Sequence, residues 1–316
     1  MRLPKDIILE DGTLNEQRIL KRESLYKGMN GRFVERFYLN PDQSYIFKPL
    51  TNNEQIGKEV WVHDHILSNF PAIFPKIIAS SNHHHPESSW MILEDLGALS
   101  HTFDKESVLG VTRYMAWWHS LPSEDYKDMA LQGLKPPIEE ITAEVLSNRE
   151  YFFEMLPFLG LEAKSVHYIF TLLSSFIFSK RQVLSHGDLH LGNFAIAGDR
   201  IIVLDWEHTH LNVPYWDLYH MIDLSHPTFP KQMSRSLREL ILDLYLEQVE
   251  WEVDPQTFKQ EYYLFSSAFS IWMILLINKD LQAKEAKWSK KQLETQLSET
   301  IENLRQCTEI LFDTKS

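Results

Sequence analysis

The segment 184–207 limits the fold of this chain more than any other part of the sequence. Residues 184–193 read LSHGDLHLGN and are dense in polar side chains. Two short apolar runs follow, separated by the turn residues 197–199 (AGD), and the second run ends in VLDWE. Two runs of this length around such a turn predict a β-hairpin. Asp188 and Asn193 precede its first strand, and Asp205 follows its second.

A hairpin returns the chain toward its starting point, so Asp205 is expected to lie near Asn193. Carboxylate and amide oxygens suit Mg²⁺, which uses few protein ligands and completes its shell with water and phosphate oxygens. Asp188, in the loop before the hairpin, is a carboxylate that could activate a hydroxyl group. The pattern predicts a hydroxyl-activating base beside a magnesium site; the alternative is that Asp188 and Asn193 only cap a turn.

The same residues resemble a known family. His186-Gly187-Asp188 with Asn193 five positions after the aspartate, then a hydrophobic residue and Asp205-Trp206-Glu207, is similar to the motifs of aminoglycoside phosphotransferases and choline kinases. Protein kinases have His-Arg-Asp and Asp-Phe-Gly at these places, so Gly187 and Trp206 indicate the small-molecule branch. The resemblance implies an α+β, two-lobed protein-kinase-like fold with a small β-rich N-lobe and a larger helical C-lobe.

The resemblance also implies an activity and its cofactors. The reaction would transfer the γ-phosphoryl group of ATP or GTP to a small-molecule hydroxyl, with Mg²⁺ bound by Asn193 and Asp205. Asp188 would be the catalytic residue. Support of the catalytic loop is expected from His186, from His190 and from Asp217, which stands in the element Pro-Tyr-Trp-Asp-Leu.

The nucleotide site is expected in the first hundred residues. Lys48 stands in a strand where the family has its phosphate-contacting lysine, and the helix after it offers Glu59 or Glu54 as a partner. Glu59 is preferred because its context, Lys-Glu-Val-Trp-Val, fits the family better. The phosphate-covering loop would contain Gly28 and Gly31, although a plain hairpin turn explains these glycines equally well. The hinge that contacts adenine would include Leu93 and Asp95.

The spacing of apolar residues along the sequence divides the chain into two parts. Residues 1–96 read as a β-rich nucleotide-binding lobe, with strands over 32–39, 44–50, 76–80 and 90–93 and one helix from the caps at 51–53 to Phe70. A hinge is expected at 93–97. Residues 97–316 form the helical catalytic and substrate-binding lobe, with helical periodicity over 107–121, 138–156, 163–180, 231–249, 256–278 and 287–312.

Composition excludes several classes of protein. The chain has 316 residues, with 31 Lys and Arg against 44 Asp and Glu, and a net charge of −13. This balance argues against a nucleic-acid or anionic-membrane partner and permits a cationic ligand. The apolar stretch 262–278 is shorter than the roughly 20 residues of a membrane span, so a buried helix is expected. The first residues lack a secretory signal, and a cytoplasmic protein, monomeric or homodimeric, is predicted.

The acceptor is the least determined part of the prediction. An aminoglycoside-like acceptor is favoured, and Glu207 and Asp223 are candidates to face such a cationic substrate. A choline, ethanolamine or sugar kinase and a non-catalytic nucleotide-binding scaffold are the alternatives. A protein kinase is disfavoured because only nine positions separate Asp205 from Pro214, and no Ala-Pro-Glu element follows. The triplet 83–85 (HHH) is interpreted as a solvated loop.

Overall fold

The computed structural model describes residues 3–28, 30–81, 85–127, 133 and 135–313. The chain forms two compact units. Unit 1 contains residues 1–100 and 195–207, and unit 2 contains residues 101–194 and 208–316. Unit 1 is built on a sheet and unit 2 mainly on helices, which is the α+β organisation expected from the sequence. The boundary predicted at residues 96 and 97 for two functional lobes stays a prediction.

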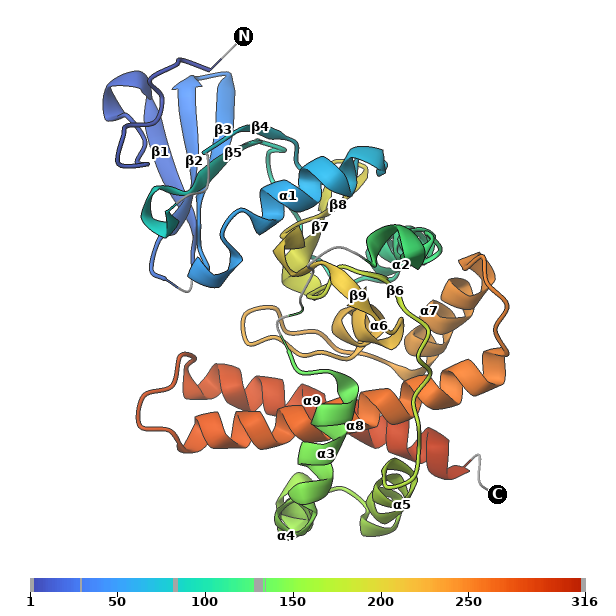
Figure 1. Ribbon diagram of the computed structural model, residues 1–316. Helices are drawn as coiled ribbons and strands as arrows, with labels where there is room; N and C mark the ends of the chain where they lie inside the picture. Colours follow the sequence, from blue (N-terminus) through green and yellow to red (C-terminus); the bar gives the residue numbers. More distant parts are fainter. Residues whose placement is uncertain (1–2, 29, 82–84, 128–132, 134, 314–316) are drawn as a thin grey trace. The chain divides into compact units, whose positions relative to one another are not determined.

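Unit 1 is built on a five-stranded antiparallel sheet (Figure 1). Its strand order is β1-β2-β3-β5-β4, and the strands span Lys21–Lys27 (β1), Phe33–Asn40 (β2), Gln43–Pro49 (β3), Ile77–Ser80 (β4) and Trp90–Glu94 (β5). Phe37, Phe47 and Ile92 on three neighbouring strands are buried and pack with Ile7 and Leu14. The four strands predicted from the sequence are confirmed.

The helix predicted from residue 51 to Phe70 is interrupted. Asn52 caps only a short 3₁₀ turn at Asn53–Gln55, and the α-helix α1 spans Lys58–His65. Gly57 before it has φ 70°, a left-handed conformation that glycine adopts without a Cβ penalty and that ends a continuous helix. A second 3₁₀ turn follows at Leu67–Asn69. The expectation of one helix was therefore wrong, although the helical turn that carries Glu59 is present.

The predicted hairpin is present, and its residues from 195 onward belong to unit 1. Strands β7 (Phe194–Ala197) and β8 (Arg200–Val203) pair with each other. The hairpin is attached to unit 1 by the bridge between Ile196 and Ser100 and by the 2.6 Å hydrogen bond that the amide of Val203 donates to the carbonyl of Ile73. These contacts position the residue that follows the hairpin, Asp205, on unit 1.

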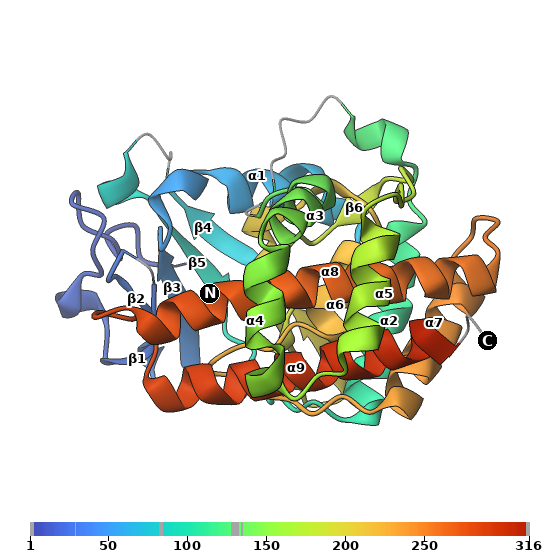
Figure 2. The ribbon, with the colours of Figure 1, turned by 90° about the horizontal axis from the view of Figure 1, so that it is seen from below.

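Unit 2 is built around two long helices that lie side by side. Its helices span Lys105–His119 (α2), Ile138–Ser147 (α3), Arg149–Leu159 (α4), Ala163–Leu173 (α5), Tyr215–Ile222 (α6), Arg235–Gln248 (α7), Pro255–Gln282 (α8) and Lys290–Asp313 (α9). α8 and α9 lie side by side, and α3 and α5 pack against α8 (Figure 2). A short antiparallel pair, β6 (Val183–Ser185) and β9 (His210–Asn212), holds the start of the polar loop.

Three features of unit 2 differ from the prediction. The helix expected over 163–180 ends at Leu173, and the chain leaves the helix at Ser174. The helix expected over 138–156 is two helices, because the chain turns at Asn148, whose φ and ψ of −97° and 17° end α3. The side chain of Asn148 donates to the carbonyl of Glu144 and so caps α3 at its carboxyl end. Neither α6 nor β9 was predicted, since each is too short for a clear period.

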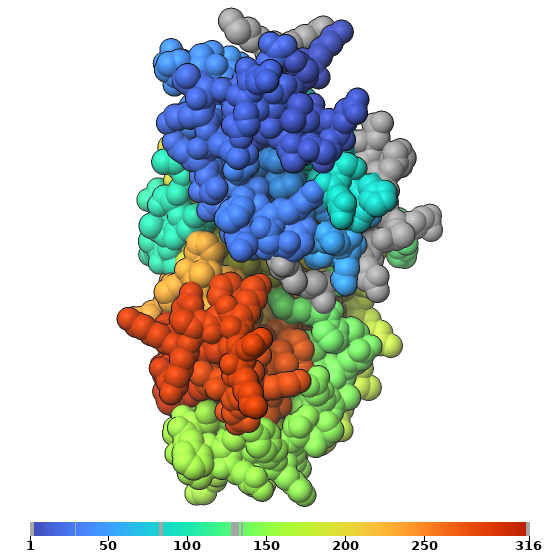
Figure 3. All heavy atoms as spheres, turned by 90° about the vertical axis from the view of Figure 1, so that its left-hand side faces the viewer, coloured from blue at the N-terminus to red at the C-terminus, as the bar shows by residue number. Residues whose placement is uncertain are grey.

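One helix of the described residues, α8, is long and apolar enough to cross a membrane, by length and composition only. Of its most apolar window, 61% is buried inside the protein. The buried side chains include those of Phe265 and Phe269, so the apolar stretch 262–278 is a core helix, as expected. The turn that joins α8 to α9 lies at the surface (orange to red in Figure 3).

Candidate functional site

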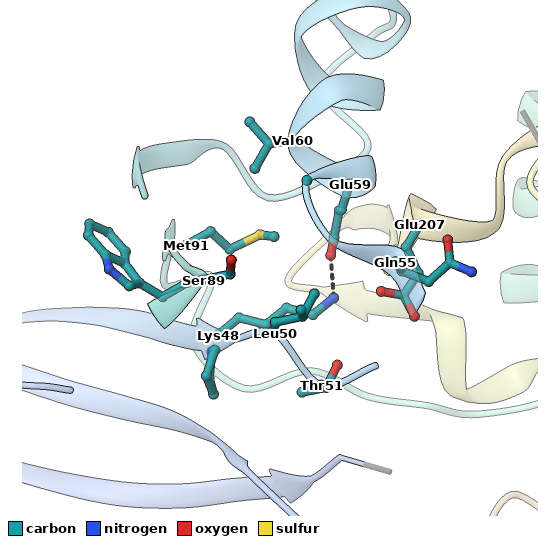
Figure 4. Close-up of a pocket in the computed structure, with 12 residues that line it drawn as sticks. Lys48, Leu50, Thr51, Gln55, Glu59, Val60, Ser89, Met91 and Glu207 are labelled. Atoms are coloured by element: carbon teal, nitrogen blue, oxygen red, sulfur yellow. Dashed lines mark hydrogen bonds and ion pairs between the residues drawn. The ribbon is translucent and has the colours of Figure 1, made fainter. Parts of the chain in front are cut away.

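Unit 1 contains a buried lysine between two carboxylates. Lys48 projects from β3, and its Nζ lies 2.5 Å from Oε2 of Glu59 on α1 (Figure 4). The same Nζ lies 2.7 Å from Oδ1 of Asp205, after β8. Only 12% of the Lys48 side chain is exposed. Glu54 is exposed in the 3₁₀ turn before α1, so of the two glutamates considered, Glu59 is the one that pairs with Lys48.

The charges of this cluster depend on one another. Burial alone would lower the pKa of Lys48, but the carboxylates of Asp205 and Glu59 outweigh burial and raise it. Burial raises the pKa of Glu59 to about 7. Lys48 opposes this rise, whereas the nearby negative charges of Asp205 and Glu207 add to it. Lys48 is therefore a permanent cation, held in place by carboxylates that would repel one another without it.

Three carboxylates in unit 1 converge on a small volume. Oxygens of Glu59, Asp205 and Glu207 all lie within 4.8 Å of one another. Among the described non-glycine residues, Asp205 alone has a positive φ, at 62°, a conformation that costs free energy and is concentrated at functional sites. The all-oxygen donor set fits a hard cation such as Mg²⁺. Glu207, expected to face a substrate, lies with these carboxylates.

The two glycines of the predicted phosphate-covering loop stand in the connection from β1 to β2. Gly31 has φ 85° and donates to the carbonyl of Gly28 at 3.0 Å. A Cβ at Gly28 would lie 2.5 Å from Cβ of Thr51, so only glycine permits this approach. Asn30 donates to the carbonyl of Leu50 at 2.7 Å. Met29 lies outside the described residues, as do His83 and His84 of the histidine triplet.

The predicted hinge residues fall at the end of β5. Leu93 is buried and pairs with Ile46 of β3. The carboxylate of Asp95 accepts hydrogen bonds from Arg36 at 2.6 Å and from Ser44 at 2.7 Å. Burial would raise the pKa of Asp95, but these bonds lower it. The Asp95 side chain therefore fixes the segment, and contact with a nucleotide would fall to its backbone.

In unit 2, one buried aspartate fixes residues 185–187, which precede Asp188. The carboxylate of Asp217, on α6, accepts from the hydroxyl of Ser185 and the amide of His186, each at 2.7 Å, and from the amide of Gly187 at 3.1 Å. His119 Nε2 also lies 3.1 Å away. Burial would raise the pKa of Asp217, but these donors hold it below its usual range. Asp217 thus fixes the backbone immediately before Asp188.

Gly187 explains why this loop differs from its protein-kinase counterpart. Its φ is 87°, and a Cβ at this position would lie 2.0 Å from the carbonyl oxygen of His208. No side chain is compatible with that distance, since real Cβ contacts are longer than 3 Å. The close passage of residue 208 therefore requires glycine before Asp188.

Asp188 and Asn193 are joined within unit 2. The Asn193 amide group donates to the backbone carbonyl of Asp188 at 2.8 Å and to its carboxylate at 3.3 Å. This orientation turns the amide oxygen of Asn193 away from Asp188 and makes it the atom suited to a cation. His190 Nδ1 accepts from the amide of Gly192, while its Nε2 lies 3.5 Å from the Asp188 carboxylate. His186 Nδ1 accepts from the amide of Asp188 at 3.3 Å.

A family model matches the middle of the chain. The sequence model of the phosphotransferase enzyme family matches residues 93–252, about half of the protein, and this range includes Asp188, Asn193 and Asp205. The chain belongs to the phosphotransferase enzyme family. The resemblance drawn from the sequence motifs is thereby confirmed. No curated protein sequence matches the chain.

Solved structures of phosphotransferases and kinases share the fold of this family member. Choline kinase from Cryptosporidium parvum superposes with a TM-score of 0.59 at 16% identity, covering 98% of this chain and 94% of that one. A mutant aminoglycoside 2'-phosphotransferase in complex with GDP gives 0.58 at 15% identity, with 95% of each chain covered. A spectinomycin phosphotransferase bound to ADP and spectinomycin gives 0.54 at 15%, with 94% of each covered. At these identities the likeness shows the fold, and the predicted protein-kinase-like α+β fold is confirmed.

Two residues near Asp188 were not predicted from the sequence. Lys135 Nζ lies 3.5 Å from Oδ1 of Asp188 and 2.6 Å from Nε2 of His220 on α6. Lys135 stands between a leucine and two prolines in a stretch without a motif, and it is 53 positions from Asp188. No local pattern could have linked them. His220, at the end of a short unpredicted helix, gave no signal either.

Asp223, the second candidate for a cationic substrate, is fully buried. One carboxylate oxygen accepts from Arg238 at 2.8 Å, and the other accepts from Tyr262 at 2.6 Å and Ser266 at 2.7 Å. Arg238 is equally buried and also contacts Asn303. This network ties α6, α7, α8 and α9 together and favours a structural role for Asp223 over contact with a substrate.

Proposed function

We propose that this protein transfers the γ-phosphoryl group of ATP or GTP to a hydroxyl group of a small molecule. The observation that carries the proposal is the loop on Asp217, which presents Asp188 and Asn193 joined by hydrogen bonds at the spacing of the family motif. Such rigid presentation suits phosphoryl transfer, in which catalysis comes mainly from positioning and charge stabilisation.

Asp188 would accept the hydrogen bond of the attacking hydroxyl. Its burial would raise its pKa, but Lys135 and His190 hold the pKa well below the usual value of an aspartate. The group is therefore a carboxylate at neutral pH and a weak base. In a loose transition state the hydroxyl proton is lost late, so Asp188 would act first by orienting the nucleophile and only then as the proton acceptor.

Magnesium would be held by Asp205 and Asn193, each through a side-chain oxygen. The carboxylate oxygens around Asp205 and the outward amide oxygen of Asn193 fit a cation that prefers oxygen ligands. The ion would neutralise charge on the β- and γ-phosphates. Lys48, oriented by Glu59, would bind the α- and β-phosphates.

The remaining nucleotide contacts would come from the backbone of unit 1. The amides around Gly28 and Gly31 would lie over the phosphates, and the main chain at Leu93 and Asp95 would bind the base. Other proteins of this fold have been solved with ADP, AMP or GDP, which supports a nucleotide as donor. A cytoplasmic location fits such a donor.

The acceptor remains open among the classes expected from the sequence. The related structures include kinases for choline and phosphotransferases for aminoglycosides and spectinomycin, so aminoglycosides, choline, ethanolamine and sugars all belong in a first screen. The alternative expected from the sequence is a nucleotide-binding scaffold without turnover. Measurement of ADP release separates this scaffold from an enzyme.

The test is nucleotide turnover with Mg²⁺ across such an acceptor panel, for the wild type and for Asp188→Ala. Acceptor-dependent ADP release by the wild type, with kcat lowered about 10²-fold or more in the variant, is the expected result. Glu309→Ala, on the last turns of α9 and exposed, is a matched carboxylate control that should be fully active. Nucleotide binding without turnover on any acceptor would favour the scaffold, and equal activity of wild type and Asp188→Ala would reject the mechanism.

A further inference from the structure

The surroundings of Asp188 in unit 2 are basic. Lys135 Nζ and His190 Nε2 each lie 3.5 Å from its carboxylate, and His220 Nε2 lies 2.6 Å from Lys135 Nζ. His226 stacks on His190 with ring centroids 4.5 Å apart, and Trp288 packs edge-on against His226. Lys287 also acts electrostatically on His226. An acceptor whose hydroxyl reaches Asp188 therefore meets the ammonium of Lys135 and a cluster of histidine and tryptophan rings.

Lys135 is held in a defined orientation by His220. His220 is fully buried, and its Nδ1 lies 2.7 Å from the carbonyl oxygen of Trp216. A carbonyl only accepts, so Nδ1 carries the ring proton. Burial, together with the charge of Lys135, keeps the pKa of His220 low, so Nε2 is unprotonated. Nε2 then accepts a hydrogen bond from the Lys135 ammonium at 2.6 Å.

This geometry leaves Lys135 able to bind a further group. An ammonium has three donors; one is directed to His220 and a second faces the Asp188 carboxylate. The Lys135 side chain is 19% exposed, so it is accessible from solvent beside Asp188. A third donor next to the attacking hydroxyl is suited to an oxygen anion on the acceptor.

The carboxylates that were expected to receive a cationic acceptor have other partners within their own units. Glu207 lies with Glu59 and Asp205 in unit 1, and Asp223 is buried in an ion pair with Arg238. Asp188 itself is compensated by Lys135. A polycationic acceptor would thus bring its ammonium groups toward Lys135 and lose free energy by like-charge repulsion.

We propose that the acceptor carries a carboxylate or phosphate near the hydroxyl that is phosphorylated, and that Lys135 binds this anionic group and determines the preference for it. This inference rests on the proposed function and replaces the aminoglycoside-like acceptor with an anionic hydroxy compound. A hydroxy acid and a sugar phosphate share the required chemistry, and the experiment separates them.

The test uses matched acceptors that share a carbon skeleton and differ in the charged group. One set is glycerol, glycerate, glycerol 3-phosphate and aminopropanediol; a second is glucose, glucuronate, glucose 6-phosphate and glucosamine. For each compound, kcat/KM and the shift in melting temperature in the presence of Mg²⁺ and ADP are measured. Wild type, Lys135→Met and Lys135→Arg are compared, with Lys164→Met on the exposed face of α5 as a matched lysine control.

Expected for the wild type is a preference for the carboxylate or the phosphate member over both the neutral and the ammonium member. Lys135→Met also removes the cation beside Asp188, so it should slow every acceptor somewhat, but it should lower kcat/KM for the anionic member about 10- to 100-fold more than for the neutral member, the scale of one lost hydrogen bond between charged groups. Lys135→Arg should retain the preference because it keeps the charge. Within each set, comparing the carboxylate member with the phosphate member tells a hydroxy acid from a sugar phosphate.

Different failures have different meanings. If the wild type prefers ammonium acceptors, or if Lys135→Met slows all acceptors equally, the inference about the acceptor is overturned while the phosphotransferase stands. If no acceptor is phosphorylated but the anionic members stabilise the wild type and not Lys135→Met, the anion site is supported and the proposed reaction is not. If neither turnover nor anion-dependent stabilisation is observed, the inference is overturned.

Discussion

Nζ of Lys48 and Oδ1 of Asp205 lie 2.7 Å apart in unit 1, although 157 positions separate the two residues in the chain. The contact connects the central strand β3 to the residue after the β7–β8 hairpin. The same lysine also pairs with Glu59. One cation therefore neutralises two carboxylates whose oxygens, with those of Glu207, converge within 4.8 Å.

The first prediction concerns the loss of this cation. Lys48→Met leaves Glu59, Asp205 and Glu207 without their shared positive partner, so the melting temperature of the protein should fall. Millimolar Mg²⁺ without nucleotide should restore part of it, and should stabilise the variant more than the wild type. Lys76→Met, at an exposed position of unit 1, serves as control. Equal Mg²⁺ effects in the two proteins would contradict this account of the cluster.

A second prediction separates the two glutamates that follow Lys48. Glu59→Gln removes the carboxylate that orients the lysine at 2.5 Å, and kcat/KM for the nucleotide should fall about 10-fold or more, on the scale of a hydrogen bond between charged groups. Glu54→Gln, at an exposed position one turn earlier, should leave it unchanged. Steady-state kinetics of both variants decides the matter, and a larger loss in Glu54→Gln would reverse the assignment.

The third prediction tests the support of the catalytic loop. Asp217→Asn replaces one of two acceptor oxygens by a donor, which then faces either the amide proton of His186, at Oδ2, or that of Gly187, at Oδ1. The free energy of unfolding should fall by about 2–4 kcal/mol, as for other buried hydrogen-bonded charges, and kcat should fall with it. Chemical denaturation of this variant beside Asp280→Asn, exposed at the end of α8, measures the effect. A variant as stable as the wild type would show that the loop does not depend on this carboxylate.

A fourth prediction concerns pH and stability. Lys231 is buried, donates to the carbonyl of Met221 at 2.6 Å, and has its pKa lowered by burial to about 7. In the unfolded chain this lysine keeps its ordinary pKa, near 10.4. Between pH 7 and that value the unfolded state therefore binds more protons than the folded state. In this range the lysine makes the free energy of unfolding rise with pH, by up to about 1.4 kcal/mol per pH unit. Lys231→Met should remove that rise. Denaturation curves at pH 7.5 and 9.5 should show the difference between wild type and variant; identical slopes would contradict the shifted pKa.

Local patterns in the sequence predicted the parts of the site that depend on neighbouring residues. The turn at residues 197–199 and the runs beside it predicted the hairpin before Asp205, and the spacing of Asp188 and Asn193 matched a family motif. The break of the first helix at Gly57 was missed because a lone glycine is compatible with several conformations. In the structure its φ is 70°, in the left-handed region.

Contacts between distant segments could not be predicted in the same way. Lys135 reaches Asp188 through the packing of α6, where His220 holds it, and neither residue stands in a pattern of its own. Asp223 was taken for a substrate-facing acid because nothing in the sequence reveals its burial with Arg238. A single sequence shows which residues carry charge, whereas the fold decides which of those charges are already paired.

The most direct test of the account is to follow the phosphoryl group itself. The protein is incubated with Mg²⁺, nucleotide labelled in the γ-phosphate and a mixture of hydroxyl acceptors, and the label is traced to products. The account predicts labelled phosphate ester of an acceptor with the wild type and almost none with Asp188→Ala or Asp205→Asn. Label that appears only as free phosphate, or an ester formed equally well by the Asp188→Ala variant, would contradict it.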